Sequence, residues 1–390
     1  MPRRPDSARD YVAALTGLRG VAAMLVFLFH YEAVNPGIRL DRLVPVVGNV
    51  LQFPFGLGFA GVDLFFVLSG FLLTLPFAWA RLNGLPRPAL GHYYRRRLLR
   101  VFPAYYAQLA ILLIGGAWFV TWRHLGGGAL LAHLGMVFNV GPHPVHPMVG
   151  LWWTLPVELS FYLILPWIAV FLLPRRWLLL LALGLLLAMV YRAWTANHFA
   201  TNGARVVLVA SHLPGSLPEF LLGASGALLV QWLHVRSIRR PGPLALDGLF
   251  LAGMLAAGLW LWFVVLPNGV VYWRGHWSML VGTIVLGFTL SVAVTALYWG
   301  SRVGRALLAN PVVYFLGLVS YSLYLWHFVV LQQAPLVFGA AWEALTGLPR
   351  FLATTALVIA VASASYFLFE RPFFRLRGRR RTSLAASPSA

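Results

Sequence analysis

Apolar runs of about 18 to 24 residues recur along the chain, separated by short segments rich in arginine. A helix needs about 20 apolar residues to cross the hydrocarbon core of a bilayer, whereas a barrel strand needs about ten alternating ones. The runs, rich in leucine, alanine, valine and glycine, therefore predict spanning helices. We expect ten, at about 12–32, 55–77, 101–122, 151–173, 177–194, 214–233, 244–266, 277–298, 312–333 and 350–369.

Composition agrees with this pattern. Hydrophobic residues make up 60% of the 390 and charged residues only 10%, whereas a soluble domain has about 25% charged residues. The sequence predicts an all-α integral membrane protein, with a transmembrane domain over 1–374 and a basic, disordered tail over 375–390. A signal peptide is disfavoured at the N-terminus, because the first run contains Arg19 and no small-residue cleavage site follows it.

The net charge of +20 comes from 30 basic residues, all of them arginine. Nucleic-acid-binding proteins carry such charge on one soluble face, but here the arginines fall in the short segments between apolar runs. With the N-terminus inside, 23 arginines lie in cytoplasmic segments and 7 in outer ones, which places both termini in the cytoplasm. We therefore expect the partner to be the lipid bilayer and not nucleic acid.

No cysteine is present, which excludes a thiol nucleophile, disulfides and thiolate metal sites. His143 and His146, in the outer segment GPHPVHPM, raise the question of a metal site. Proline keeps this segment irregular and no carboxylate accompanies the histidines, so the sequence predicts no metal.

The first apolar run, Leu15 to Glu32, contains the pattern that organises our functional hypothesis. Arg19 and His30 are eleven residues apart, about three helical turns, and so share one face roughly 16 Å apart along the axis. A cation near one membrane surface then lines up with a titratable base near the other. The structural alternative is a snorkelling anchor at Arg19 and an interfacial cap at His30.

Acidic residues number ten in all, so those inside apolar runs are informative. Asp63 in span two and Glu158 in span four each cost a few kcal/mol at a bilayer centre unless they are paired or hydrated. By helix rise, both reach a depth similar to that of His30 and His327. The alternatives are a polar network that only holds helices together, and for His327 a place in an interfacial aromatic belt.

On the inner side, the segment YYRRRLLRVFPAYY places four arginines before or at the third span. Arg97 and Arg100 are three residues apart and share a face, so with Arg19 they suit several phosphate groups. The alternative is a topology signal alone. In span two, Ser69 and Gly70 are small and suit either close helix packing or passage of a narrow substrate.

Six segments, taken in order, resemble the membrane acyltransferase-3 family, which includes O-antigen, peptidoglycan, exopolysaccharide and macrolide O-acyltransferases. The segments are GLRGVAAMLVFLFH, GVDLFFVLSGFLLT, YYRRRLLRVFPAYY, LWWTLPVELSFYLILP, GLVSYSLYLWH and the closing FERPF. The resemblance implies that Arg19 with His30 is the family's Arg/His pair, that Arg97 and Arg100 form its RxxR motif, and that His30 is the catalytic base. It also implies a bacterial inner, or cytoplasmic, membrane.

The resemblance implies an O-acyltransferase, which we expect to move a short acyl group, acetyl foremost, from acyl-CoA to a hydroxyl of a cell-envelope or exported glycan or glycolipid. His30 takes the hydroxyl proton, Asp63 or Glu158 orients the imidazole, and Arg19, Arg97, Arg100 and Ser69 contact CoA. An acyl-histidine intermediate is the alternative to direct transfer.

Two other functions fit a polar network inside a membrane. A transporter or flippase of a lipid-linked glycan moves its substrate without consuming acyl-CoA. A membrane sensor or scaffold loses no chemistry when His30 is changed. The sequence leaves the acyl group, the acceptor and the oligomeric state open.

Overall fold

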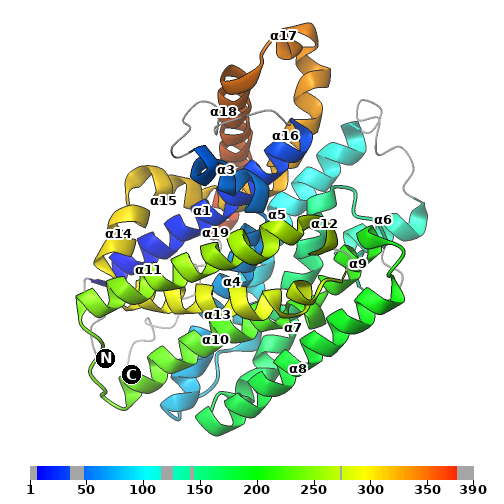
Figure 1. Ribbon diagram of the computed structural model, residues 1–390. Helices are drawn as coiled ribbons and strands as arrows, with labels where there is room; N and C mark the ends of the chain where they lie inside the picture. The colour runs from blue at the N-terminus through cyan, green and yellow to red at the C-terminus, as the bar shows by residue number, and fades with distance from the viewer. Residues whose placement is uncertain (1–6, 36–47, 116–125, 141–144, 273–274, 376–390) are drawn as a thin grey trace, which may run out of the picture. The chain divides into compact units, whose positions relative to one another are not determined.

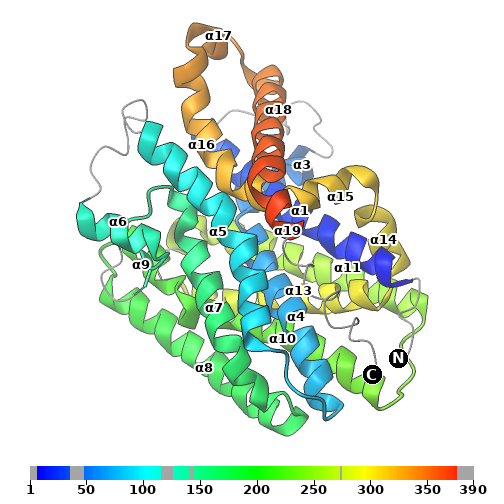
Figure 2. The ribbon, with the colours of Figure 1, turned by 180° about the vertical axis from the view of Figure 1, so that it is seen from behind.

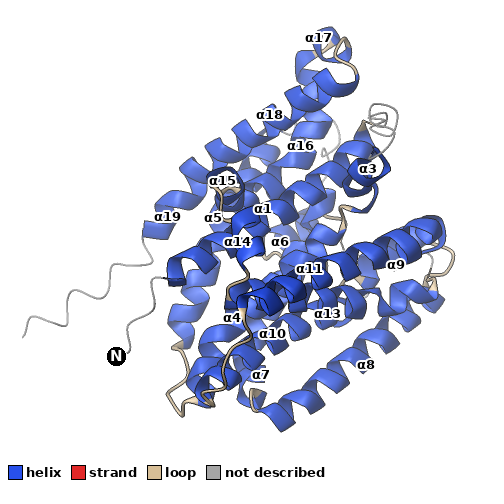
Figure 3. Ribbon diagram, turned by 60° about the vertical axis from the view of Figure 1, so that its left-hand side comes forward, coloured by secondary structure: helices blue, strands red, loops and turns tan. Residues whose placement is uncertain are grey.

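The computed structural model describes residues 7–35, 48–115, 126–140, 145–272 and 275–375. Within these ranges every regular element is a helix (Figure 3), which confirms the predicted all-α class. His143 and residues 376–390 of the predicted tail lie outside the described residues.

Nine helices in the described ranges are long and apolar enough to cross a membrane, and a tenth span results if α15 and α16 count as one. These ten follow the predicted spans in order, which confirms a multi-pass membrane protein. The third differs most: α5 runs over Leu90–Ile114, not from residue 101. Arginine is a good helix former with a long apolar stem, so the helix begins before the apolar run does.

Two compact units make up the chain, and each is discontinuous. Unit 1 comprises Met1–Pro88 and Gly127–Ser320, and unit 2 comprises Ala89–Gly126 and Tyr321–Ala390. In unit 1 the helices are α1 (Ser7–Val34), α3 (Gly48–Leu57), α4 (Ala60–Leu82), α6 (Gly127–Leu134), η3 (Gly150–Trp153), α7 (Thr154–Ile168), η4 (Ala169–Phe171), α8 (Pro174–His198), α9 (Gly203–Ala210), α10 (Leu213–Val235), α11 (Pro243–Trp260), η5 (Leu261–Val265), η6 (Leu266–Asn268), α12 (Gly269–Tyr272), α13 (Trp277–Trp299), α14 (Arg302–Leu308) and α15 (Pro311–Leu318). In unit 2 they are α5, α16 (Ser320–Phe338), α17 (Ala340–Glu343), α18 (Gly347–Ser365), η7 (Tyr366–Glu370) and α19 (Arg371–Arg375).

The core of unit 1 is formed by α4, α10 and α13, with α13 lying between α10 and α11 (Figure 1). At the crossing of α4 and α10 the two backbones nearly touch. A Cβ on Gly70 would lie 2.1 Å from the carbonyl oxygen of Phe220, and one on Gly223 would lie 2.2 Å from that of Val67. Glycine is required on both sides, so Gly70 serves helix packing, the first of its two predicted uses.

Helix α1 packs against α4 and α15 in the same unit. On α15, a Cβ on Gly317 would lie 1.9 Å from the carbonyl oxygen of Thr16. This close approach fixes the half of α1 that carries Arg19, and the continuous helix carries His30 on the next turns. The expected helix with Arg19 and His30 on one face is therefore present.

In unit 2, α5 packs against η7 and α19 (Figure 2). Buried polar side chains join α5 to α16: the Gln108 side-chain amide donates to the Leu325 carbonyl at 2.7 Å, and the Tyr321 hydroxyl donates to the Val101 carbonyl at 2.9 Å. Such bonds between helices take the place of the hydrophobic driving force that lipid does not supply.

Candidate active site

The imidazole of His30 is held by its own helix. Its Nδ1 lies 2.8 Å from the Val26 carbonyl oxygen, one turn earlier. A carbonyl oxygen only accepts hydrogen bonds, so Nδ1 carries the proton and Nε2 is the basic nitrogen. Phe29 packs edge-on against the ring, with centroids 5.1 Å apart and an interplanar angle of 87°. The ring is thus oriented in the tautomer that a general base needs.

Arg19 lies further back along α1 and is partly buried. Its guanidinium carbon is 5.7 Å from the centroid of the Phe65 ring on α4. Cations placed over an aromatic face in this way are stabilised by the ring quadrupole. The contact positions Arg19 inside unit 1, and its predicted contact with CoA stays a prediction.

Ser69 and Glu158 are brought together from α4 and α7. The serine hydroxyl donates to Oε1 of the glutamate at 2.6 Å. Sequence reasoning had assigned Glu158 to catalysis and Ser69 to the donor, and did not pair them. The short bond supplies the partner that an intramembrane carboxylate requires.

Asp63 faces a different partner from the one we expected. Its carboxyl group is hydrogen-bonded to that of Glu219, on α10, and the guanidinium of Arg192, on α8, lies close enough to attract both. Two carboxyl groups form such a bond only when one carries a proton, so the pair is protonated once. With Arg192 the group is then neutral overall, which suits a buried setting.

Arg192 ties this cluster to α13 and, a second time, to α10. It is 4% exposed, and it donates from Nε to the Met279 carbonyl at 2.8 Å and from Nη1 to the Gly215 carbonyl at 3.0 Å. The Tyr272 side chain lies close to the same charges, and its ring packs against Phe59 with centroids 6.4 Å apart. We call Asp63, Glu219, Arg192 and Tyr272 the carboxyl-pair cluster.

Aromatic packing links this cluster to the helix that carries His30. Phe59, which contacts Tyr272, also packs against Phe29 at 5.6 Å, and Phe29 contacts the His30 ring. The cluster and the proposed base are therefore connected through packed side chains of one unit.

Sequence reasoning missed Glu219 and Arg192, although signals for both are present. Glu219 is an acid inside an apolar run and meets the criterion that had identified Asp63 and Glu158. Arg192 was counted among the seven outer arginines because it stands at the end of its predicted span, but the structure has it buried within α8.

Unit 2 holds the remaining candidates. Arg97 and Arg100 lie one turn apart on α5, and the guanidinium carbon of Arg100 is 6.0 Å from the Phe374 ring centroid. His327 is fully buried and its Nδ1 is 3.0 Å from the Leu323 carbonyl oxygen. The contact repeats the His30 arrangement and so makes Nε2 its basic nitrogen as well.

The closing FERPF segment, quoted above only as a family resemblance, has a structural task in unit 2. The Glu370 carboxylate accepts hydrogen bonds from the backbone N–H and the hydroxyl of Ser322, in the first turn of α16. The first turn of a helix has unsatisfied N–H groups and favours a negative charge. Glu370 therefore anchors the helix that carries His327.

The segment before α7 is fixed by a histidine that we had not singled out. His133 is fully buried; its Nδ1–H donates to the Ala129 carbonyl at 2.7 Å, and its Nε2 accepts from the Met148 N–H at 2.9 Å. Burial lowers the pKa of His133 below its ordinary value. His146 is exposed, and the described residues contain no group of three His, Asp or Glu side chains arranged to hold a metal ion.

Comparison with known proteins shows which family the sequence belongs to. The sequence pattern of the acyltransferase domain named Acyl_transf_3 matches residues 12–368. The chain belongs to the acyltransferase-3 family. The resemblance inferred from the six segments is therefore confirmed. The matched region includes the candidate residues of unit 1 and those of unit 2.

Among relatives of this family, acyltransferase MdmB of Streptomyces mycarofaciens is 27% identical over 97% of this chain and 95% of its own length. Peptidoglycan O-acetyltransferase OatA of Listeria monocytogenes is 25% identical over 95% of this chain, and O-acetyltransferase OatA of Staphylococcus aureus is 24% identical over 93%. The chain spans 57% of the length of each OatA protein. No solved structure matches it.

Proposed function

We propose that this acyltransferase-3 protein is an O-acyltransferase of a bacterial inner membrane. It moves a short acyl group, most simply acetyl, from acyl-CoA to a hydroxyl of a cell-envelope or exported glycan. Family membership supports acyl transfer, and the name of one relative, peptidoglycan O-acetyltransferase, supports a glycan acceptor. The observation that carries the mechanism is the His30 imidazole, oriented by Val26 with Nε2 as its base.

In the proposed reaction, Nε2 of His30 takes the proton of the acceptor hydroxyl while the hydroxyl oxygen attacks the thioester carbonyl. The new C–O bond forms, the C–S bond breaks, and the imidazolium returns the proton to the departing thiolate. The Val26 carbonyl accepts from Nδ1–H throughout, and this bond strengthens when the ring is charged. It takes the orienting role that we had expected of Asp63 or Glu158, whose hydrogen bonds go to Glu219 and Ser69.

Mass spectrometry of the envelope glycans, with and without the intact protein, tests this function directly. Loss of an acyl group from one glycan would name both donor and acceptor chemistry. A glycan that changes side of the membrane without any change of mass, and without release of CoA, would instead support the flippase. That result would overturn the proposal.

The donor-binding role of Arg97 and Arg100 gives a kinetic prediction. Each Arg→Ala change removes a charge-assisted hydrogen bond to phosphate, so the KM for acetyl-CoA should rise about tenfold to a hundredfold. Lysine at either position should restore only part of the affinity, because it lacks the planar fork. The matched control is Arg96→Ala, an exposed arginine of the same helix. Equal effects at all three positions would make the arginines topology signals.

The two substrates are proposed to approach from opposite sides of the membrane, with the nucleotide of CoA cytoplasmic and the acceptor outside. The chain lacks cysteine, so single cysteines beside Arg100 and beside His30 can be labelled with a membrane-impermeant maleimide in vesicles of known orientation. We expect CoA to slow labelling beside Arg100 from the cytoplasmic side. We expect the acceptor to slow labelling beside His30 from the outer side. Protection by the acceptor from the cytoplasmic side alone would refute transfer across the membrane.

A further inference from the structure

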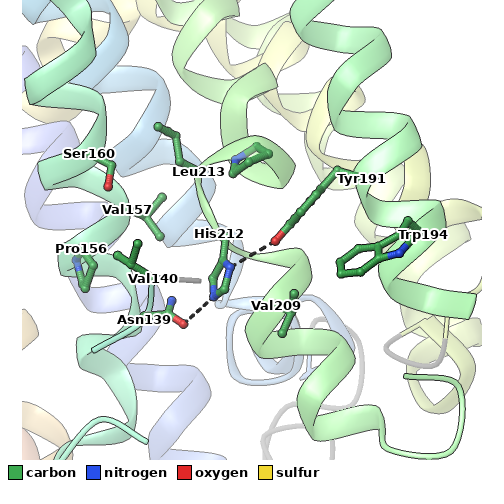
Figure 4. Close-up of a pocket in the computed structure, with 11 residues that line it drawn as sticks. Asn139, Val140, Pro156, Val157, Ser160, Tyr191, Trp194, Val209, His212 and Leu213 are labelled. Carbon is green, nitrogen blue, oxygen red and sulfur yellow. Dashed lines mark hydrogen bonds between the residues drawn. The ribbon is translucent and has the colours of Figure 1, made fainter. Parts of the chain in front are cut away.

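A cavity that none of the proposed chemistry uses lies in unit 1 between α7, α8 and the start of α10 (Figure 4). Its volume is about 390 Å³, within the range of roughly 300–1,000 Å³ found for small-molecule sites. Val157 and Ser160 of α7 lie on its wall, and Glu158, between them in sequence, reaches Ser69 on α4. One turn of α7 therefore serves both the cavity and the Ser69–Glu158 pair.

A chain of hydrogen bonds runs along the cavity wall through Asn139, His212 and Tyr191. The bond that Asn139 makes to the Trp153 carbonyl determines which group donates at each step. The Asn139 side-chain amide donates to the Trp153 carbonyl at 3.0 Å, so its oxygen faces His212, whose Nε2–H donates to it at 2.8 Å. His212 Nδ1 then accepts from the Tyr191 hydroxyl at 3.1 Å (Figure 4). The Tyr191 hydroxyl uses its O–H to donate to His212, and its oxygen can still accept a hydrogen bond.

The wall is uncharged. None of the eleven described residues that line it is an arginine or a carboxylate, and burial lowers the pKa of His212 to about 4. His212 is therefore neutral at physiological pH. Phosphate and carboxylate groups would lack a counter-charge here, so neither CoA phosphates nor an anionic glycan fits this wall.

Apart from Ser160, the remaining lining is aromatic and apolar. The ring centroids of Tyr191 and Trp194 are 5.8 Å apart with an interplanar angle of 34°, and Trp194 is 45% exposed. Rings of this kind offer a flat apolar face beside a polar edge. A sugar ring has the complementary surface: an apolar C–H face for the indole, and hydroxyls that donate to Tyr191 and exchange hydrogen bonds with Ser160.

We propose that this cavity is an acceptor subsite that binds a neutral sugar ring of the glycan. The assignment rests on the proposed transfer to a glycan hydroxyl. It adds that recognition of the acceptor is separate from His30 and depends on an uncharged aromatic wall. It also gives the Tyr191–His212–Asn139 chain a purpose, which is to hold the tyrosine hydroxyl in one orientation.

Single-cysteine protection tests binding without requiring turnover. Val140 lines the cavity and is 54% exposed, whereas Val137, three residues earlier, is 50% exposed and does not line it. We expect millimolar neutral tetrasaccharides of N-acetylglucosamine, glucose or galactose, at least one of the three, to slow maleimide labelling of Val140→Cys but not of Val137→Cys. Tetragalacturonate, which is anionic, should have no effect. Protection by none of the three sugars, or by decanol alone, would overturn the proposal.

A second set of variants tests the wall itself. Trp194→Ala should weaken the sugar protection roughly threefold to tenfold, the scale of one aromatic contact, and Tyr191→Phe should weaken it by a similar factor. The matched control is Leu187→Ala, a half-exposed residue of α8 outside the cavity. Protection without any acyl transfer would retain the subsite and reject the proposed function. Transfer with unchanged acceptor KM in both wall variants would reject the subsite and retain the function.

Discussion

His30→Ala is expected to lose acyl transfer by about a hundredfold to ten-thousandfold, the range found when a positioned general base is removed. This corresponds to roughly 2.7–5.5 kcal/mol of transition-state stabilisation. The loss should appear in kcat, because Nε2 acts on a proton that moves only in the transition state. The helix itself should be unaffected, because the imidazole bonds to a carbonyl of its own turn.

The measurement is transfer from labelled acetyl-CoA by purified protein in nanodiscs, with unfolding temperature as the folding control. His92→Ala, an exposed histidine of α5, is the matched variant and should behave as wild type. Normal turnover in a folded His30→Ala protein would remove the mechanism. Release of CoA by the wild-type protein without any acceptor, lost in His30→Ala, would instead favour an acyl-histidine intermediate.

The carboxyl-pair cluster should tolerate replacement of one of its two carboxyl groups by an amide, but not replacement of both. In Asp63→Asn or in Glu219→Gln, the amide donates to the surviving carboxylate and Arg192 keeps one counter-charge, so we expect each single change to cost about 1 kcal/mol or less. The double variant leaves the buried Arg192 without a counter-charge. Its cost should be about 3–5 kcal/mol, measured by SDS unfolding in mixed micelles.

The control has the same chemistry in a different place. Asp63→Asn combined with Glu343→Gln removes the same number of carboxylates, but Glu343 is exposed on α17, so the two effects should add. If Asp63→Asn/Glu219→Gln is also additive, the two carboxyl groups do not share a proton. Arg192→Met in that double variant removes the unpaired charge and should recover part of the stability.

Hydropathy predicted nearly all of the architecture, because bilayer thickness alone sets the length of a spanning helix. Hydropathy located the start of α5 poorly, because the arginines before the apolar run are helical although they are not hydrophobic. It also revealed neither unit, because the bonds that join α5 to α16, Gln108 to Leu325 and Tyr321 to Val101, connect segments more than 200 residues apart.

The sequence predicted which residues belong to the candidate site better than it predicted the contacts between them. Because a carboxylate inside a bilayer is unfavourable in free energy, the sequence identifies Asp63 and Glu158 as unusual. It does not show which group each of them contacts. Partners depend on the rotation of neighbouring helices: the Gly70–Gly223 crossing brings α10, with Glu219, against α4. The burial of Arg192 was missed for the same reason, because a position near a span end does not reveal that the side chain donates to the carbonyls of Gly215 and Met279.

The discontinuity of unit 2 also imposes an order on biosynthesis. Its first piece ends at Gly126 and its second begins at Tyr321, and at about 5–20 residues per second a ribosome needs roughly 10–40 s to make the 194 residues between them. During that interval α5 enters the bilayer without α16 or α19, and the Gln108 side-chain amide lacks the Leu325 carbonyl as its partner. A nascent chain halted inside this window is therefore the one most exposed to membrane quality control, and shortening the delay should raise the yield of folded protein.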